Sequence, residues 1–295
     1  MKRIKGVPVI MYHSIGPLKP GWPWNNLVMP TEVFEGQMRA LAEKGWTTIT
    51  LRALHDHMSK GAPLPDKPIV LTFDDGYLDN WVFAYPILKK YERHAVIWMT
   101  TDFVDPAPNP RPNLEDVWKG NAAEKDLPVM GFLSWPEMRI MIESGAVEIQ
   151  SHAKTHTWHH AGPEIVDFHR PRGADRYVPP PWLGWNRRPD RKYEYMTARL
   201  EDEVPYGTPI YRHEKSIAAK RYFEDGALTE RLVAHVARGG GAEFFDRANW
   251  REELLAVAKD FGPRRDRTET DREYEDRVRA EITESRSIIE RELGV

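Results

Sequence analysis

The stretch IVLTFDDGYLDNW, residues 69–81, places a run of apolar and β-branched residues directly before two carboxylates and a glycine. A continuous apolar run of this length predicts a strand that is buried on both faces. The strand brings Asp74 and Asp75 to its carboxyl end, where parallel α/β folds place functional side chains. Neighbouring strand residues point to opposite faces, so the two carboxylates need not share one role. A turn or a helix N-cap is the structural alternative for such aspartates.

Within the first 150 residues of the chain, which include this stretch, predicted strands alternate with predicted helices. Apolar runs predict strands at 7–13, 46–50, 68–73, 94–104 and 146–152. Amphipathic segments predict helices at 31–45, 51–61, 77–93 and 134–145. This order predicts an α/β fold with parallel strands and outer helices, arranged as a barrel or as a doubly wound sheet.

Composition limits the classes of protein to which the chain can belong. Of its 295 residues 41% are hydrophobic and 29% are charged, which is enough for a packed core, and its net charge of −3 gives no reason to expect nucleic acid. The absence of cysteine excludes disulfides and thiolate metal sites. No apolar run approaches the ~18 residues of a membrane span. The apolar run Val7–Tyr12 is too short for a signal peptide, so we expect a cytoplasmic protein.

The composition changes after residue 157. Residues 157–195 are rich in Pro, Trp, Arg and His, which predicts a long loop or an inserted subdomain. Helices are expected at 216–222 and 228–236, and one long amphipathic helix at 270–293. The expected organisation is an N-terminal part of the barrel at 1–156, an insertion at 157–270, and a helix that returns to the barrel at 271–295.

A second group of polar residues follows the fifth predicted strand, in IQSHAKTH, residues 149–156. His152 and His156 stand four apart, and a helical continuation would put both imidazoles on one face. Both groups follow parallel strands and therefore fall on the same rim of one sheet. One aspartate with two histidines makes a three-ligand zinc site with one open position, and the other aspartate would then be a general base. His159 and His160 are interpreted as solvated loop residues.

The pair TFDDG (72–76) and SHAKTH (151–156) resembles the polysaccharide deacetylases of the NodB homology group, carbohydrate esterase family 4. The flanking pieces PVIMYHSIG and EITESRSIIERELG also look like that family. The resemblance implies a distorted (β/α) barrel, similar to a TIM barrel, and a metal-dependent hydrolase. The sequence departs from the family at Ala153, where Ser or Thr is usual, and we expect this change to alter only local hydrogen bonding.

The resemblance also implies a role for each matching residue. Asp74 would be the catalytic base, and Asp75, His152 and His156 would hold Zn²⁺ or another divalent metal. The expected reaction is N-deacetylation of an N-acetylated sugar in a polysaccharide or its precursor. An amidase acting on a small non-sugar amide, a non-catalytic carbohydrate-binding pseudoenzyme and a purely structural metal site are the alternatives.

Aromatic residues of the insertion are candidates for stacking on sugar rings, and equally for the small core of the insertion. They are Trp158, Trp182, Trp185 and Tyr177.

The late strands of the family and its late catalytic histidine are not recognisable in this sequence. We therefore expect a barrel that is incomplete at its C-terminus and that a second copy of the chain, or an additional chain, completes across the open edge. Without such a partner we expect little deacetylase activity. His13, or a histidine of the insertion, would otherwise replace the late acid.

Overall fold

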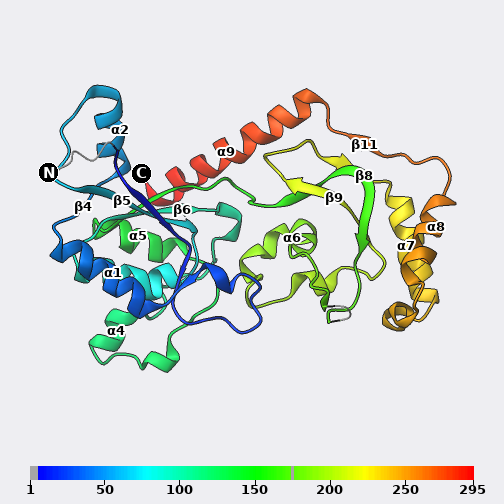
Figure 1. The fold of residues 1–295 in the computed structure, drawn as a ribbon, viewed down its shortest axis with the longest axis horizontal. Helices are drawn as coiled ribbons and strands as arrows, with labels where there is room; N and C mark the ends of the chain where they lie inside the picture. Colours follow the sequence, from blue (N-terminus) through cyan, green and yellow to red (C-terminus); the bar gives the residue numbers. More distant parts are fainter. Residues whose placement is uncertain (1–5, 174–175) are drawn as a thin grey trace. The chain divides into compact units, whose positions relative to one another are not determined.

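The computed structural model describes residues 6–173 and 176–295. The chain divides into two compact units. Unit 1 comprises Met1–Thr155 and Ile282–Val295, and unit 2 comprises His156–Glu281. Unit 1 is therefore discontinuous in sequence, and the chain leaves it and returns to it once. Figure 1 labels the helices and strands along the chain.

Unit 1 is built on a five-stranded parallel sheet, which confirms the predicted α/β class. The strand order is β1-β5-β6-β7, and β4 pairs with the beginning of β5. Among the described residues no pairing joins β7 back to β1. The strands are β1 Val9–Tyr12, β4 Thr47–Thr48, β5 Pro68–Asp75, β6 Ala95–Met99 and β7 Val147–Ser151. A separate two-stranded pair is formed by β2 Ser14–Ile15 and β3 Val28–Met29.

The helices of unit 1 begin and end at residues suited to those positions. Thr50 accepts a hydrogen bond from the backbone of Ala53 and so caps α2, which ends at Gly61 with φ 69°. Ser134 and Glu137 form a capping box at the start of α5. The helices are α1 Thr31–Glu43, α2 Leu51–Lys60, α3 Tyr85–Lys90, α4 Leu114–Trp118 and α5 Trp135–Glu143, with the π-helix η2 Asn80–Ala84 and the 3₁₀ turns η1 Asn25–Leu27, η3 Thr101–Phe103 and η4 Glu124–Asp126. Figure 1 shows α1 and α5 on one side of the strands.

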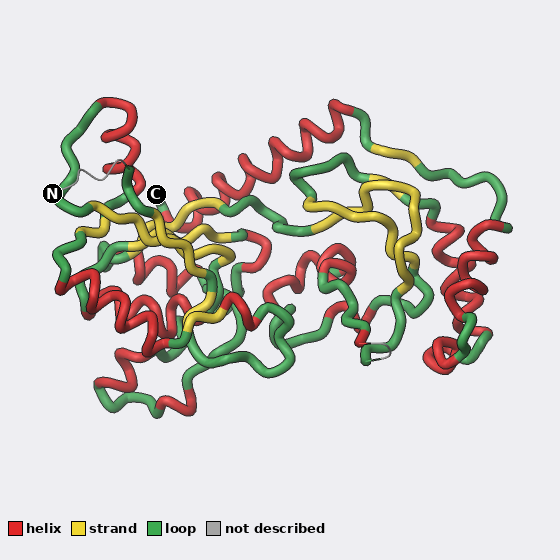
Figure 2. The backbone as a smooth tube through the Cα atoms, viewed as in Figure 1, coloured by secondary structure: helices red, strands yellow, loops and turns green. Residues whose placement is uncertain are grey.

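Unit 2 has its own hydrophobic core, formed between a long hairpin and helices. Strand β8 Trp158–Phe168 pairs antiparallel with β9 Pro209–Lys215, and β10 Tyr222–Phe223 pairs with β11 Arg267–Thr268. Its other elements are α6 Trp182–Arg187, η6 Pro189–Glu194, η7 Leu200–Glu203, α7 Gly226–Arg238, η8 Gly241–Asp246 and α8 Trp250–Lys259. Figure 2 distinguishes these strands and helices by colour. The expected helix at 216–222 is wrong, because this segment is a turn that leads into β10.

The last helix, α9 Asp271–Leu293, contributes residues to both units. Its residues from Ile282 onward belong to unit 1, where Ser285 is fully buried. No helix among the described residues is both long enough and apolar enough to cross a membrane.

Candidate metal centre and active site

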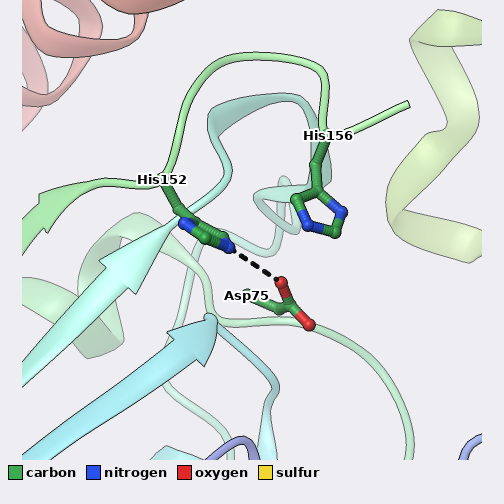
Figure 3. A group of neighbouring side chains, drawn as sticks. All are labelled: Asp75, His152 and His156. Atoms are coloured by element: carbon green, nitrogen blue, oxygen red, sulfur yellow. Dashed lines mark ion pairs between the residues drawn. The ribbon is translucent and has the colours of Figure 1, made fainter. Parts of the chain in front are cut away.

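The structure brings Asp75, His152 and His156 together (Figure 3). One ligand atom from each residue lies within 4.8 Å of those of the other two. His152 Nε2 is 3.5 Å from Asp75 Oδ1. Among the described residues this is the one group of three or more such side chains that is close enough to hold a metal ion. Two imidazoles and one carboxylate are a donor set suited to zinc or another divalent ion.

The backbone at this site adopts conformations that L-residues rarely take. Asp75 has φ 72°, Ala153 has φ 68° and His156 has φ 44°. Such strained conformations cluster at functional sites, where the surrounding structure holds them in place. The helical continuation considered for residues 152–156 is wrong, because this segment is an irregular loop. The histidines meet through the shape of the loop, and helical spacing plays no part.

Glycine is required directly after the two aspartates. Gly76 has φ 74°, and a Cβ atom built at this position would lie 2.1 Å from the sulfur of Met99. A side chain at residue 76 would therefore force the Met99 side chain to move and would also strain the backbone at this positive φ.

The loop that carries His152 is tied to the C-terminal helix. The Ser151 hydroxyl donates to Ser285 Oγ at 2.8 Å, and the Ser285 hydroxyl donates to the carbonyl of Ala153 at 3.1 Å. Lys154 forms an ion pair with Glu284 on the same helix. Ala153, where the sequence differs from the usual Ser or Thr of the family, is thus held by a hydrogen bond to its backbone carbonyl.

Asp74 lies at the end of β5, half-buried beside charged and titratable neighbours. Burial raises the pKa of its carboxyl above the ordinary value, the imidazoles of His152 and His13 lower it, and the Asp75 carboxylate raises it. The net effect of these neighbours and of burial is a raised pKa of the Asp74 carboxyl, which corresponds to a stronger base. His13 directly follows β1, so its position at the same sheet rim could be inferred from the strand pattern.

Of the aromatic residues proposed for sugar stacking, Trp158 is half-buried and the others lie in the interior of unit 2. Trp182 is 6% exposed and Trp185 is 3% exposed, so neither indole offers a face to a sugar, and their burial favours the alternative of a small core. The Lys215 ammonium lies 3.7 Å from the centre of the Trp158 ring and covers one of its faces. Tyr177 is also buried.

His159 and His160 are not solvated loop residues, because both belong to β8 and are half-buried. Burial lowers the pKa of His159 to about 4, with further lowering by Arg221 and Arg277. His160 Nδ1 is 3.2 Å from a carboxylate oxygen of Glu224. Neither imidazole belongs to the group formed with Asp75.

Two side chains near the predicted site were not identified from the sequence. Lys215 Nζ lies 3.3 Å from His156 Nε2. Lys19 forms a buried ion pair with Asp79, four residues beyond Asp75. In sequence, Lys215 is 59 residues from His156, and Lys19 is 60 residues from Asp79. No local spacing pattern links residues at such separations.

Known proteins are similar to this chain in sequence and in fold. Residues 61–173 match the family model described as polysaccharide deacetylase. A Bacillus subtilis (strain 168) protein, named as a candidate polysaccharide deacetylase, YxkH, is 38% identical over 93 residues, which are 32% of this chain and 31% of that protein. The poly-beta-1,6-N-acetyl-D-glucosamine N-deacetylase of Escherichia coli (strain K12) is 28% identical over 43% of this chain and 17% of its own length. The matches thus span a third or less of these curated relatives.

The likeness to solved structures extends over nearly the whole chain. A de-N-acetylase from Aggregatibacter actinomycetemcomitans superposes with a TM-score of 0.53 at 18% identity and covers 98% of this chain and 76% of its own. At this identity the likeness concerns the fold alone. It extends through both units, so the architecture of unit 2 also has a counterpart among known structures.

Proposed function

We propose that this chain hydrolyses the acetamide of an N-acetylated sugar in a polysaccharide or its precursor, because residues 61–173 match the family model described as polysaccharide deacetylase. The observation that carries the proposal is the group of Asp75, His152 and His156 next to Asp74. The name of the E. coli relative points to polymers of β-1,6-linked N-acetylglucosamine as the first substrate class to test.

We propose that Asp75, His152 and His156 hold one divalent ion, with Zn²⁺ as the first candidate. The donor set fits this role, since three ligands leave a coordination position open for substrate or water. A bound ion of this kind supplies Lewis-acid chemistry that polarises an amide carbonyl and acidifies water. The alternative of a purely structural site would require a fourth protein ligand, and the group contains three.

Asp74 is the proposed general base. Its carboxylate takes a proton from the attacking water. His13 lies close enough to influence the Asp74 carboxyl and is the proposed donor of a proton to the departing amine. A positioned acid or base of this type contributes about 10²–10⁴ in rate.

A direct assay tests the proposal. Protein loaded with Zn²⁺ is incubated with β-1,6-linked and β-1,4-linked N-acetylglucosamine oligomers, and both released acetate and new free amines are measured. Equal amounts of the two products from either oligomer support the proposal. Turnover of either oligomer shows deacetylase activity, and the ratio of the two rates shows which linkage the protein prefers.

The alternatives correspond to distinct results of this assay. Sugar binding without acetate release would identify a carbohydrate-binding pseudoenzyme. Turnover of simple acetamides but of neither oligomer would identify a small-molecule amidase. A cytoplasmic location, and completion of the barrel by a second chain, stay predictions. The former would make the substrate a nucleotide-linked or lipid-linked sugar.

A further inference from the structure

A fully buried ion pair joins Lys19 to Asp79, which lies in the segment that follows the two aspartates. Lys19 Nζ is 2.7 Å from Asp79 Oδ2, and both side chains are 1% exposed. The same ammonium donates to Ser14 Oγ at 2.6 Å, and the Ser14 hydroxyl donates to Asp79 Oδ2 at 2.5 Å. Lys19 Nζ also lies 5.1 Å from the ring centre of Trp22. The charges of this cluster are therefore matched within the interior.

The cluster extends to the backbone of His13. Asn80 Nδ2 donates to the carbonyl of His13 at 2.8 Å and to Asp79 Oδ1 at 3.1 Å. Asp79 thus accepts from donors on both sides of its carboxylate and joins two segments. One segment runs from His13 to Lys19 after β1, and the other follows Asp74 and Asp75 after β5.

Asn80, which joins the two segments, lies at the start of an unusual helical turn. Asn80 is the first residue of the π-helix η2, and its carbonyl accepts from the backbone of Tyr85. Isolated π-turns are rare and are frequent at functional sites. Asn80 is 1% exposed, and no hydrogen bond among the described residues satisfies its Oδ1 atom. The amide group is therefore held by its two donated bonds.

Stability alone does not explain such a cluster. Desolvation of two charges offsets much of their mutual attraction, and well-packed apolar residues of similar volume often serve equally well. A buried ionic network does fix the geometry of the groups that it joins. In this chain those groups are the backbone of His13 and the turn after Asp75.

We propose that Ser14, Lys19, Asp79 and Asn80 form a positioning network that holds His13 beside Asp74, where it can protonate the departing amine. This inference rests on the proposed function and names further residues that serve the same site. The four residues act through His13 and touch neither substrate nor metal. Displacement of a reacting group by about 1 Å can cost about 10²-fold in rate.

Asp79→Asn is the principal test, because it keeps the shape of the side chain and removes its charge. We expect kcat to fall by about 10-fold or more, with KM changed less than about twofold and the content of bound Zn²⁺ unchanged. Glu137→Gln is the matched control, since Glu137 is also fully buried and ion-paired, with Arg111, in a different part of unit 1. The control should lose thermal stability to a similar extent and keep its kcat.

A second measurement does not depend on turnover. In protein labelled with ¹⁵N-histidine, the imidazole signals of His13 are assigned with His13→Gln. We expect these signals to shift or broaden in Asp79→Asn and in the milder Ser14→Ala, and to stay in place in Glu137→Gln. If Asp79→Asn does not fold, Ser14→Ala carries both measurements.

The outcomes separate this inference from the proposed function. If wild-type protein hydrolyses no N-acetylated probe, the proposed function fails and the His13 signals alone decide the positioning network. Unchanged His13 signals in Ser14→Ala and Asp79→Asn overturn the network. A loss of kcat that merely follows the loss of thermal stability, as judged against Glu137→Gln, overturns it as well.

Discussion

His13 and Asp74 follow residues that are paired with each other, because β1 and β5 run parallel with Tyr12 opposite Phe73. His13 directly follows Tyr12, and Asp74 directly follows Phe73, so the two residues lie at the same level of neighbouring strands. The His13 imidazole lowers the pKa of the Asp74 carboxyl against the dominant effect of burial, which raises it. Strand register therefore places a candidate proton donor beside the candidate base.

Replacement of His13 tests its role as the acid. His13→Gln should reduce kcat by about 10²-fold, because the leaving amine loses its proton donor, while bound metal stays at the wild-type level. Steady-state kinetics and metal analysis measure the two effects. His55→Gln is the control, since the side chain of His55 is 65% exposed. Normal turnover in His13→Gln would assign the acid to another residue.

Asp74→Asn should keep the metal and lose at least about 10²-fold in kcat, because the amide cannot accept the proton of the attacking water. Asp75→Asn is the informative comparison, since we expect it to weaken metal binding itself. Kinetics and metal content measured on both variants distinguish base from ligand. Loss of metal in Asp74→Asn would contradict the roles assigned to the two neighbours.

Metal binding should depend on all three proposed ligands. Addition of Zn²⁺ to chelator-treated wild-type protein should raise its melting temperature, because an ion that binds the folded state selectively stabilises it. His152→Ala and His156→Ala should lose this increase, whereas His57→Ala, a histidine outside the group, should retain it. Calorimetric melting with and without Zn²⁺ provides the measurement. Full retention of metal by His152→Ala would exclude the site.

The stability of unit 2 should decrease as the pH falls from about 6.5 to about 4. Burial lowers the pKa of His159 and of His169 to about 4, below the ordinary value of 6.5. Between these values the unfolded chain binds protons that the folded chain does not, so the free energy of unfolding rises with pH across this interval. Urea unfolding at a series of pH values measures this slope.

The variant His169→Phe tests the origin of that slope. It keeps a ring next to Tyr177 and Tyr206 and removes a titrating group, so the slope should become smaller. His55→Gln should leave the slope as it is, because His55 is exposed. An unchanged slope in His169→Phe would assign the pH dependence to other groups.

The parallel sheet and the meeting of Asp75 with His152 were predictable because both depend on local sequence signals. The apolar runs predict strands at 68–73, 94–104 and 146–152 by themselves, and each range overlaps an observed strand, although β6 ends at Met99, five residues before the predicted end. Parallel pairing then brings the residues that follow these strands to one rim. Asp75 and His152 therefore meet without any long-range information beyond the order of the strands.

Features that depend on tertiary contacts were not predictable in the same way. The hairpin of β8 and β9 joins segments on either side of the proline-rich stretch, and its length was not apparent in a composition that suggested a loop. Helical propensity at 216–222 gives way to a turn and the short strand β10. The pairing of Lys19 with Asp79 has no sequence signal, because the two residues meet in the folded interior and not through local spacing.

The contact of α9 with the histidine loop has a consequence for the order in which the molecule is made. Ser285 is 132 residues beyond Ala153, the residue whose carbonyl it binds. At a synthesis rate of about 5–20 residues per second, the loop waits on the order of ten seconds on the ribosome for this partner. The strands of the sheet, by contrast, are all present by Ser151. The nascent chain can thus assemble its sheet early, while the loop that carries His152 reaches its final form only after Ser285 has been made.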